Sequence, residues 1–240
     1  MSRMDIHFYF DPVCPFAWVT SKWVRIVQIQ RHYRVDWRFI SLRLLNAGIN
    51  YDEHFPAGYE AGHSAGLKLL RVAARARAER GHDAVGPLYA ALGARIFDME
   101  HDGHRPVGWA GTRAFLEPIL LDVGLPMQFA DALDDDSWDA ELASETDEAL
   151  ALTGKDVGTP IIHFQPPAGV AFFGPVISRL PTEDQAGPLW DHVIGLTGFA
   201  GFAELKRSLR ERPQLASFGV AADQPGIQED WRGGSRRTKK

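Results

Sequence analysis

The sequence predicts an α/β protein in which a long helical insertion interrupts a small sheet. Three observations support this: a strand–helix–strand pattern over residues 6–42, no alternating run rich in Val and Ile over residues 43–156, and two strand-like runs with a following helix over residues 159–196. The chain has 240 residues, of which 45% are hydrophobic and 24% charged. A globular chain of this length can bury a sizeable core without disulfides or metals.

The first unit begins with a nearly continuous apolar run. Residues 6–10 are Ile-His-Phe-Tyr-Phe, and aromatic residues in so short a run favour a buried strand. Over residues 16–31 the apolar side chains recur at helical spacing, and Pro15 suits a first helical turn, where its missing N–H is not needed. Residues 35–42 alternate in part and predict a second strand. This order predicts a right-handed crossover between two parallel strands.

The middle of the chain is predicted to be helical throughout. Apolar residues recur there at helical spacing, and Gly81 is typical of a helix end. The predicted helices cover residues 55–80, 86–99, 107–123, 126–133 and 138–152.

Strand signals return after this block. Residues 159–164 and 170–173 predict two strands, and the turn rich in Pro and Gly between them predicts a β-hairpin. A helix over residues 183–196 and a shorter one over residues 202–210 are expected next. From Ser217 the chain is polar and rich in Gly, which predicts a disordered tail.

These elements divide the chain into two predicted domains and a tail. Residues 1–45 and 155–215 form one discontinuous domain, residues 46–154 form a helical insertion domain, and residues 216–240 form the tail. Without the insertion, the order of elements is that of a thioredoxin-type core, with parallel outer strands, an antiparallel hairpin and packing helices. The predicted fold class is therefore α/β, a thioredoxin-like fold with a large helical insertion.

Charge and cysteine content exclude several classes of protein. The 26 basic and 31 acidic residues give a net charge of −5, so we expect neither nucleic acid nor an anionic membrane as a partner. No apolar run approaches a membrane span, and the first one is too short for a signal peptide. One cysteine excludes an intramolecular disulfide and a multi-cysteine zinc site, and a lone thiol suits a reducing compartment. We therefore expect a cytoplasmic protein.

Cys14 is the strongest candidate for a catalytic residue. It lies where the first strand ends and the first helix begins, between Pro12 and Pro15, which favour an abrupt, exposed turn. Unpaired N–H groups and the positive end of the helix dipole favour a thiolate at such a position, so we expect the pKa of Cys14 to be lowered. The alternative is that Cys14 is a small buried hydrophobic residue, as free cysteines usually are.

A second candidate segment, Gly158-Thr159-Pro160, precedes the first hairpin strand. In a thioredoxin-type core this loop faces the nucleophile, and the backbone of Thr159 would pair with an extended thiol ligand there. The alternative is an ordinary trans proline at a strand start, because proline cannot donate to a sheet ladder. The sequence does not decide whether the bond before Pro160 is cis or trans.

Three segments together resemble a known family. They are residues 10–18 with Cys14-Pro15, residues 157–163 with Gly-Thr-Pro, and residues 170–181 with Phe-Phe-Gly-Pro-Val. In this order they resemble the DsbA-like thioredoxin superfamily, and within it the actinobacterial mycothiol-dependent nitroreductase branch. The resemblance implies an oxidoreductase with Cys14 as nucleophile. It also implies a site for thiol or substrate, formed by Pro15, Phe16, Ala17, Trp18, Gly158, Thr159 and Pro160.

One departure from the family pattern limits what carries over. The family has Cys-Pro-x-Cys, and here Ala17 occupies the second cysteine position. A second thiol of the same chain therefore cannot resolve a mixed disulfide. What remains is a monothiol mechanism, in which Cys14 exchanges with a low-molecular-weight thiol. Two alternatives stay open: an enzyme like the kappa-class glutathione transferases or hydroxychromene-carboxylate isomerases, and a thioredoxin-fold protein without catalysis.

The resemblance also sets the expected partners. No tightly bound cofactor is expected, and mycothiol or, less favoured, glutathione would act as co-substrate. A small electrophile or nitro compound would be reduced. A homodimer is left open, and the sequence does not identify the physiological substrate.

Other polar and aromatic residues have a structural explanation that we favour. No metal site is expected, because the cluster at residues 100–104 is typical of a solvated loop. We expect His63 on a solvated helix face, although it could line the cleft above Cys14. His7 and His163 are expected in the sheet, and Arg179 in a surface ion pair. Trp18 and Trp23 are expected to pack in the core, and Phe16 to be exposed enough to meet an apolar substrate.

Overall fold

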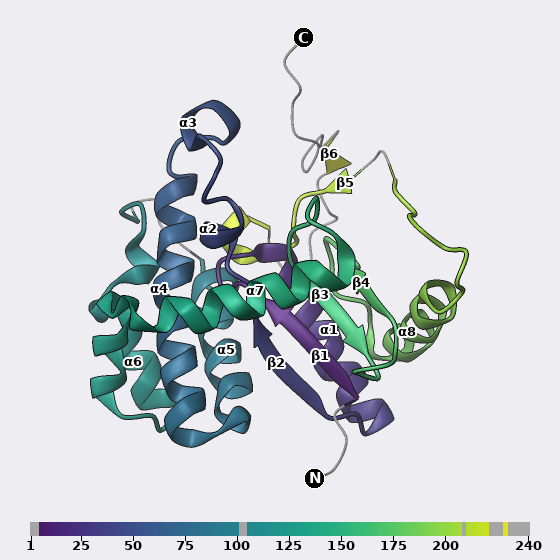
Figure 1. Ribbon diagram of the computed structural model, residues 1–240, viewed down its shortest axis with the longest axis horizontal. Coiled ribbons are helices and arrows are strands. Elements are labelled where there is room, and N and C mark those ends of the chain that lie inside the picture. Colours follow the sequence, from purple (N-terminus) through teal and green to yellow (C-terminus); the bar gives the residue numbers. More distant parts are fainter. Residues whose placement is uncertain (1–4, 101–104, 208–209, 221–227, 230–240) are drawn as a thin grey trace.

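The structure is a computed structural model, and it describes residues 5–100, 105–207, 210–220 and 228–229. A four-stranded sheet in the order β2-β1-β3-β4 lies at its centre (Figure 1). β1 and β2 are parallel, whereas β3 is antiparallel to both β1 and β4. The bounds are β1 (Ile6–Phe10), β2 (Val35–Phe39), β3 (Ile161–Phe164) and β4 (Ala171–Phe173). The predicted parallel pair and the predicted hairpin are both confirmed.

The two faces of β1 pack against different helices. Ile6, Phe8 and Phe10 belong to the large apolar core, which also contains the buried side of α1 (Pro15–Arg31). On the opposite face, the Tyr9 hydroxyl donates to Glu148 of α7 (Asp139–Thr153) at 2.8 Å. Successive side chains of a strand point to opposite faces of the sheet. The sheet therefore has α1 packed on one face of β1 and α7 on the other.

Helices fill the middle of the chain, as predicted. Figure 1 shows α4, α5 and α6 gathered on one side of the sheet, with α7 crossing over it. The α-helices before α7 are α2 (Leu42–Leu45), α3 (Tyr51–His54), α4 (Tyr59–Arg80), α5 (Val85–Gly93) and α6 (Arg113–Asp122). The 3-10 segments are η1 (His82–Ala84), η3 (Trp109–Gly111), η4 (Met127–Asp134) and η5 (Asp136–Trp138), and the π-helical η2 (Ala94–Asp98) extends α5. The boundaries of the predicted domains stay a prediction.

The helical block contacts the first helix of the core through a glycine. A Cβ atom at Gly93 would lie 2.2 Å from Cε3 of Trp18. The Trp18 ring is 4% exposed, packs edge-on against Tyr89, and donates through Nε1 to Asp98 at 3.1 Å. Trp18 therefore packs in the core, as expected. Its indole ring occupies the space that a side chain at residue 93 would need.

Gly93→Ala is expected to destabilise the fold by about 1–3 kcal/mol, because a rigid, enclosed indole ring must move to admit the methyl group. The midpoint of urea unfolding measures the change. Gly62→Ala is the matched control, since Gly62 is also helical and nothing lies within 4 Å of its added Cβ. The control should be neutral or stabilising by up to about 1 kcal/mol. Equal midpoints for both variants would contradict the packing argument.

Some predicted elements differ from the structure in the first 155 residues. The strand predicted over residues 35–42 ends at Phe39, because Ser41 caps α2. The helices α2 and α3 were not predicted, since four residues are too few to show a helical period. The helix predicted over residues 126–133 is the 3-10 segment η4.

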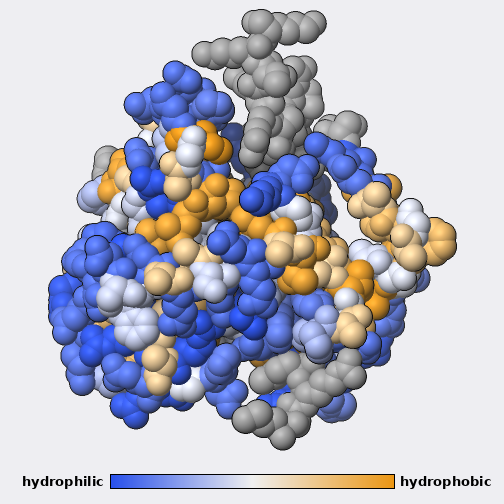
Figure 2. All heavy atoms as spheres, in the orientation of Figure 1, coloured by the Kyte–Doolittle hydropathy of each residue, from blue (hydrophilic) through white to orange (hydrophobic). Residues whose placement is uncertain are grey.

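The helix predicted over residues 202–210 is wrong. Residues 202–207 follow α8 (Glu183–Thr197) without helical structure, and Arg210–Glu211 form the short strand β5, paired with β6 (Gln228–Glu229). A short helix depends on packing of an apolar face, and Leu205 is 76% exposed. Figure 2 shows apolar side chains gathered at the end of α8 and on the segment after it. The packing that a helix would need is missing there.

The start of the predicted disordered tail is also wrong. Ala216–Phe218 form the 3-10 turn η6, and Val220 is 6% exposed. Leu215, at 3% exposed, belongs to the main apolar core and anchors this turn. Most of the remaining tail lies outside the described residues.

Candidate functional site

Cys14 is the N-cap residue of α1. Its backbone is extended, Pro15 follows at the first helical position, and its sulfur accepts a hydrogen bond from the Ala17 N–H at 3.5 Å. The sulfur thus satisfies one of the N–H groups that a helix leaves free at its start. The predicted location of Cys14 at the end of β1 and the beginning of α1 is confirmed.

The Gly158-Thr159-Pro160 loop lies directly against this sulfur. The Cys14 thiol donates to the Thr159 carbonyl oxygen at 3.5 Å, and the Thr159–Pro160 peptide bond is cis. The Thr159 hydroxyl donates to the Tyr9 carbonyl oxygen at 3.0 Å, which holds the loop against the end of β1. Two segments that are 145 residues apart therefore meet at one sulfur atom. The bond that the sequence left undecided is cis.

The electrostatic environment of Cys14 differs from the expectation. The residue is 8% exposed, and burial raises the pKa of the thiol to about 12. The Ala17 N–H lowers the pKa in part, and the nearby carboxyl of Asp11 raises it. The predicted lowering of this pKa is wrong, because the loss of solvation outweighs the helix N-terminus. A pKa raised this far keeps the thiol protonated at neutral pH.

The other predicted site residues divide into two groups by location. Pro15 and Phe16 are half-buried on the first turn of α1, so Phe16 is less exposed than expected, and Ala17 is fully buried beneath them. Trp18 points into the core, as described above. Across from them, Gly158 is half-buried and Pro160 is buried. The structure brings the first turn of α1 and the proline loop together, and their roles in binding stay predictions.

Asp11 is a buried acid that the sequence analysis did not single out. One of its carboxylate oxygens accepts from the Val13 N–H at 3.0 Å, and the other accepts from the Leu42 N–H at 2.8 Å. Asp11 is 0% exposed, and burial raises its pKa to about 7, although the two N–H groups lower it in part. The sequence does contain a sign of this role. Asp11 directly follows a predicted strand and lies three residues before Cys14, in a turn whose backbone N–H groups need a hydrogen-bond acceptor.

Gly66 of α4 explains why Asp11 is sealed from water. A Cβ atom at Gly66 would lie 2.4 Å from the Asp11 Oδ1 atom and 2.7 Å from the Val13 side chain. The helix backbone therefore packs directly on the loop that carries Cys14. This contact places the helical insertion against the candidate site.

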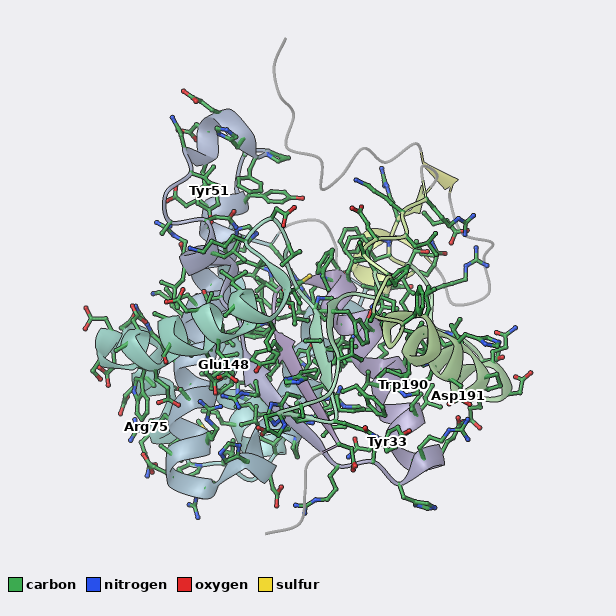
Figure 3. The ribbon with its side chains drawn as sticks, turned by 45° about the vertical axis from the view of Figure 1, so that its right-hand side comes forward. Tyr33, Tyr51, Arg75, Glu148, Trp190 and Asp191 are labelled. Carbon is green, nitrogen blue, oxygen red and sulfur yellow. The ribbon has the colours of Figure 1, made fainter. Side chains whose placement is uncertain are left out.

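His63 lies one turn before Gly66 on α4, and its environment is not the solvated face that we expected. Its ring sits among the aromatic rings of Tyr51, Phe55 and Tyr59, and its Nδ1 atom is 3.0 Å from the Tyr51 hydroxyl. Burial lowers the pKa of His63 to about 4. Figure 3 shows Tyr51 in the lobe formed by α3 and the start of α4. The sequence could not predict this cluster, because it did not predict α3.

His7, His163 and Arg179 have the structural roles that we favoured. His7 and His163 are paired residues of β1 and β3, with ring centroids 6.0 Å apart. Arg179 is 60% exposed at its side chain and pairs with Glu211. Of the cluster at residues 100–104, His101 and His104 lie outside the described residues. Within the part of the chain that is described, no three His, Cys, Asp or Glu side chains come together as a metal site would require.

Helix length and composition also bear on a membrane role. None of the helices in the described part of the chain combines the length and the apolar character needed to span a bilayer.

Comparison with known proteins gives one family and one curated relative. The model of the Rv2466c-like family, described as mycothiol-dependent nitroreductase Rv2466c, matches residues 13–207. An uncharacterized protein of Mycobacterium tuberculosis, Rv2286c, is 31% identical over 205 residues, which are 84% of this chain and 81% of that protein. The family match includes the segment from Cys14 through the proline loop to the hairpin, because it begins at Val13 and extends beyond β4.

A solved structure supports the fold. The crystal structure of a putative protein disulfide isomerase from Nitrosomonas europaea has a TM-score of 0.53 at 13% identity, covering 81% of this chain and 98% of that one. At this identity the likeness concerns the fold alone. The fold is thioredoxin-like with a large helical insertion, as predicted.

Proposed function

Because this chain belongs to the Rv2466c-like family of mycothiol-dependent nitroreductases and is a thiol-dependent oxidoreductase, we propose that it acts as a monothiol enzyme through Cys14. The observation that carries the proposal is the contact between the Cys14 sulfur and the Thr159 carbonyl oxygen at 3.5 Å. This contact puts the chain's single thiol at the start of a helix and against the loop that carries the cis Thr159–Pro160 bond.

The proposed reaction has two exchange steps. In the first, the Cys14 thiolate attacks one sulfur of a small disulfide, so that a bond to Cys14 forms and the original S–S bond breaks, releasing a small thiolate. In the second, an external small thiolate attacks the small-molecule sulfur of the mixed disulfide. A new small disulfide leaves, and Cys14 is released as a thiolate.

An external thiol is needed because the chain has no resolving group. Cys14 is the single cysteine of the sequence, and Ala17 lies in the first turn of α1 with its N–H directed at the sulfur. A mixed disulfide on Cys14 therefore persists until a second small thiol arrives. This requirement suits a reducing cytoplasm, where such thiols are abundant.

The proposed substrates follow from the family and from the balance of electrons. The two exchange steps interconvert disulfides and supply no electrons to another substrate. For a reduction, the Cys14 thiol and one small thiol give two electrons and two protons as they become the mixed disulfide, and these reduce a small electrophile or take a nitro group to a nitroso group and water. A second small thiol then releases Cys14 as a thiol and leaves with the first as the small disulfide. We propose mycothiol as the thiol, with glutathione as the less favoured choice. The residues that would contact the thiol are those of the first turn of α1 and of the proline loop, Pro15, Phe16, Ala17, Gly158, Thr159 and Pro160, with Trp18 supporting the turn from below.

Incubation of the protein with the disulfide of mycothiol or of glutathione is expected to give one covalent adduct, located on Cys14. Intact-mass spectrometry measures the adduct, and added small thiol should remove it. Because the pKa of the free thiol is raised by burial, the rate of adduct formation should rise with pH through and above neutrality. Cys14→Ser is the control and should form no adduct while keeping the same unfolding midpoint.

Two results would contradict this mechanism in different ways. Absence of any adduct at all pH values would leave a thioredoxin-fold protein without thiol exchange. Thiol binding and turnover that persist in Cys14→Ala would instead point to an enzyme that activates an external thiol without bonding to it, as in the kappa-class transferases.

A further inference from the structure

We propose that residues 210–220 form a strap that covers the entrance to Cys14 and swings away before a small thiol or disulfide reaches the sulfur. This inference rests on the proposed role of Cys14 as the nucleophile, and it concerns how access to that site is controlled. Cys14 is 8% exposed, whereas exchange requires an incoming sulfur to touch the Cys14 sulfur. Part of the chain that covers Cys14 therefore has to move during the proposed reaction.

One side of the strap lies on the helical insertion. Its 3-10 turn η6 packs against the π-helical η2. η2 in turn contacts α1, because Asp98 accepts hydrogen bonds from the Trp18 ring at 3.1 Å and from Lys22 at 2.7 Å. Figures 1 and 3 both show the yellow turn η6 near the start of α1, the helix that Cys14 caps. The strap therefore borders the first turns of that helix.

The other side of the strap is attached to the segment that follows β4. The Gln214 N–H donates to the Ser178 carbonyl oxygen at 2.6 Å, and the Ser178 hydroxyl donates to Glu211 at 3.1 Å. Glu211 also forms an ion pair with Arg179. The same segment contacts α1, where the Thr20 hydroxyl donates to one of its carbonyl oxygens at 2.8 Å. The strap thus joins the insertion to the sheet domain beside the start of α1.

The strap is held by two apolar anchors and one ion pair at the surface. The anchors Leu215 and Val220 are 3% and 6% exposed. The Arg179 side chain is 60% exposed, so water can replace its pairing with Glu211 at little cost. The Ser217 hydroxyl is buried and has no hydrogen-bond partner among the described residues, so the closed position denies it a bond that water would supply. These features suit a segment that detaches while the rest of the chain stays folded.

The other segments that enclose the site are fixed more firmly. The proline loop is bonded to the end of β1, where the Thr159 hydroxyl donates to Tyr9, and it continues into the interior strand β3. α4 packs on the turn that carries Cys14 through Gly66, with no space between. The family match ends at residue 207, so the strap is an addition to the part of the chain that the family model describes.

The test is the rate of Cys14 alkylation by iodoacetamide at one fixed pH, measured by intact mass with Cys14→Ser as the blank. Leu215→Ala removes an anchor and should raise the rate on the order of tenfold or more, because opening of the strap becomes easier. Leu120→Ala is the matched control, since Leu120 is a fully buried leucine of α6. It should lower the unfolding midpoint and leave the alkylation rate nearly unchanged.

The ion pair at the surface gives a second variant that does not endanger folding. Arg179→Gln should raise the alkylation rate by about two- to fivefold, the range expected for an exposed pair. Arg113→Gln is its control, because Arg113 is similarly exposed on α6 and pairs with Glu117 and Asp131. It should not change the rate. High salt should accelerate alkylation of the unmodified protein and have little effect on Arg179→Gln, because salt screens the pair.

Hydrogen exchange tests the same opening in the unmodified protein if Leu215→Ala does not fold. Peptides that cover residues 212–220 should exchange their protected amides faster than peptides that cover β1 and β3, because the strap opens without global unfolding. Equal protection of the strap and the sheet overturns the proposal, and so do strap variants that alkylate no faster than their controls.

The alkylation result is independent of the disulfide experiment described above. Iodoacetamide reports access to the Cys14 sulfur whether or not a small disulfide reacts with it. Faster alkylation in the strap variants without any disulfide adduct would therefore support the strap and contradict the monothiol mechanism. An adduct that forms equally fast in Leu215→Ala, Leu120→Ala and the unmodified protein would support the mechanism and overturn the strap.

Discussion

Ala17→Cys is expected to give a protein that forms an intramolecular disulfide with Cys14 and no longer accumulates a mixed disulfide. The backbone nitrogen of residue 17 already lies 3.5 Å from the Cys14 sulfur, and the two residues share the first turn of α1. A cysteine side chain at this position is therefore within the reach that disulfide geometry allows. The second thiolate would attack Cys14 and expel the small thiol, which restores a dithiol cycle.

The measurement is intact mass after incubation with a small disulfide, together with a count of free thiols. The unmodified protein should carry one adduct, whereas Ala17→Cys should carry none and have no free thiol. Ala17→Ser is the control, since it adds a heavy atom of similar position without a second sulfur, and it should keep the adduct. If Ala17→Cys keeps both an adduct and a free thiol, the side chain at residue 17 does not reach the Cys14 sulfur, and the expectation is wrong.

The location of Cys14 could be predicted because it depends on local signals. An aromatic apolar run for β1, a Pro at the first helical position, and helical spacing over α1 all lie within about 30 residues of the sequence. The parallel pairing of β1 with β2 and the antiparallel hairpin at residues 161–173 followed from the same kind of pattern. These signals do not depend on what the rest of the chain does.

The protonation state of Cys14 could not be predicted, because it depends on distant residues. The sulfur is enclosed by Thr159, and the turn beneath it is covered by Gly66 and fixed by the Leu42 N–H. None of these contacts has a signal near Cys14 in the sequence. A helix N-terminus is a local feature that lowers a thiol pKa, whereas desolvation is a tertiary feature that raises it, and here the tertiary feature is larger.

The same distinction explains the error at His63. We expected His63 on a solvated face because a histidine on a helix of the insertion is most often solvated, and that inference holds for a helix taken alone. The four-residue helix α3 returns across this face and supplies Tyr51, whose hydroxyl is 3.0 Å from the His63 ring. A helix of four residues is too short to show a helical spacing of apolar residues. The sequence therefore could not predict α3 or the aromatic contacts that it makes with His63.

Glu145→Ala is expected to destabilise the protein by about 3–5 kcal/mol, because it removes the buried carboxylate that two arginines share. The carboxylates left to these arginines, Glu148 for Arg38 and Glu141 for Arg77, are much more exposed. One Glu145 carboxylate oxygen accepts from Arg38 of β2 at 2.8 Å and from Arg77 of α4 at 2.9 Å, and the other accepts from the Phe39 N–H at 2.9 Å. The Arg77 and Glu145 side chains are only 9% and 10% exposed. This one carboxylate therefore joins the sheet, the long helix of the insertion and α7.

Glu148→Ala provides the comparison, since Glu148 lies one turn further along α7 and also pairs with Arg38. Its side chain is 46% exposed, and Figure 3 shows it on the same helix. Water can replace its contacts to Arg38 and to the Tyr9 hydroxyl, so a loss of about 1 kcal/mol is expected. Urea unfolding midpoints measure both variants. Similar losses at the two positions would mean that the interior of this network is hydrated, and that the attachment of the insertion to the sheet depends on apolar packing instead.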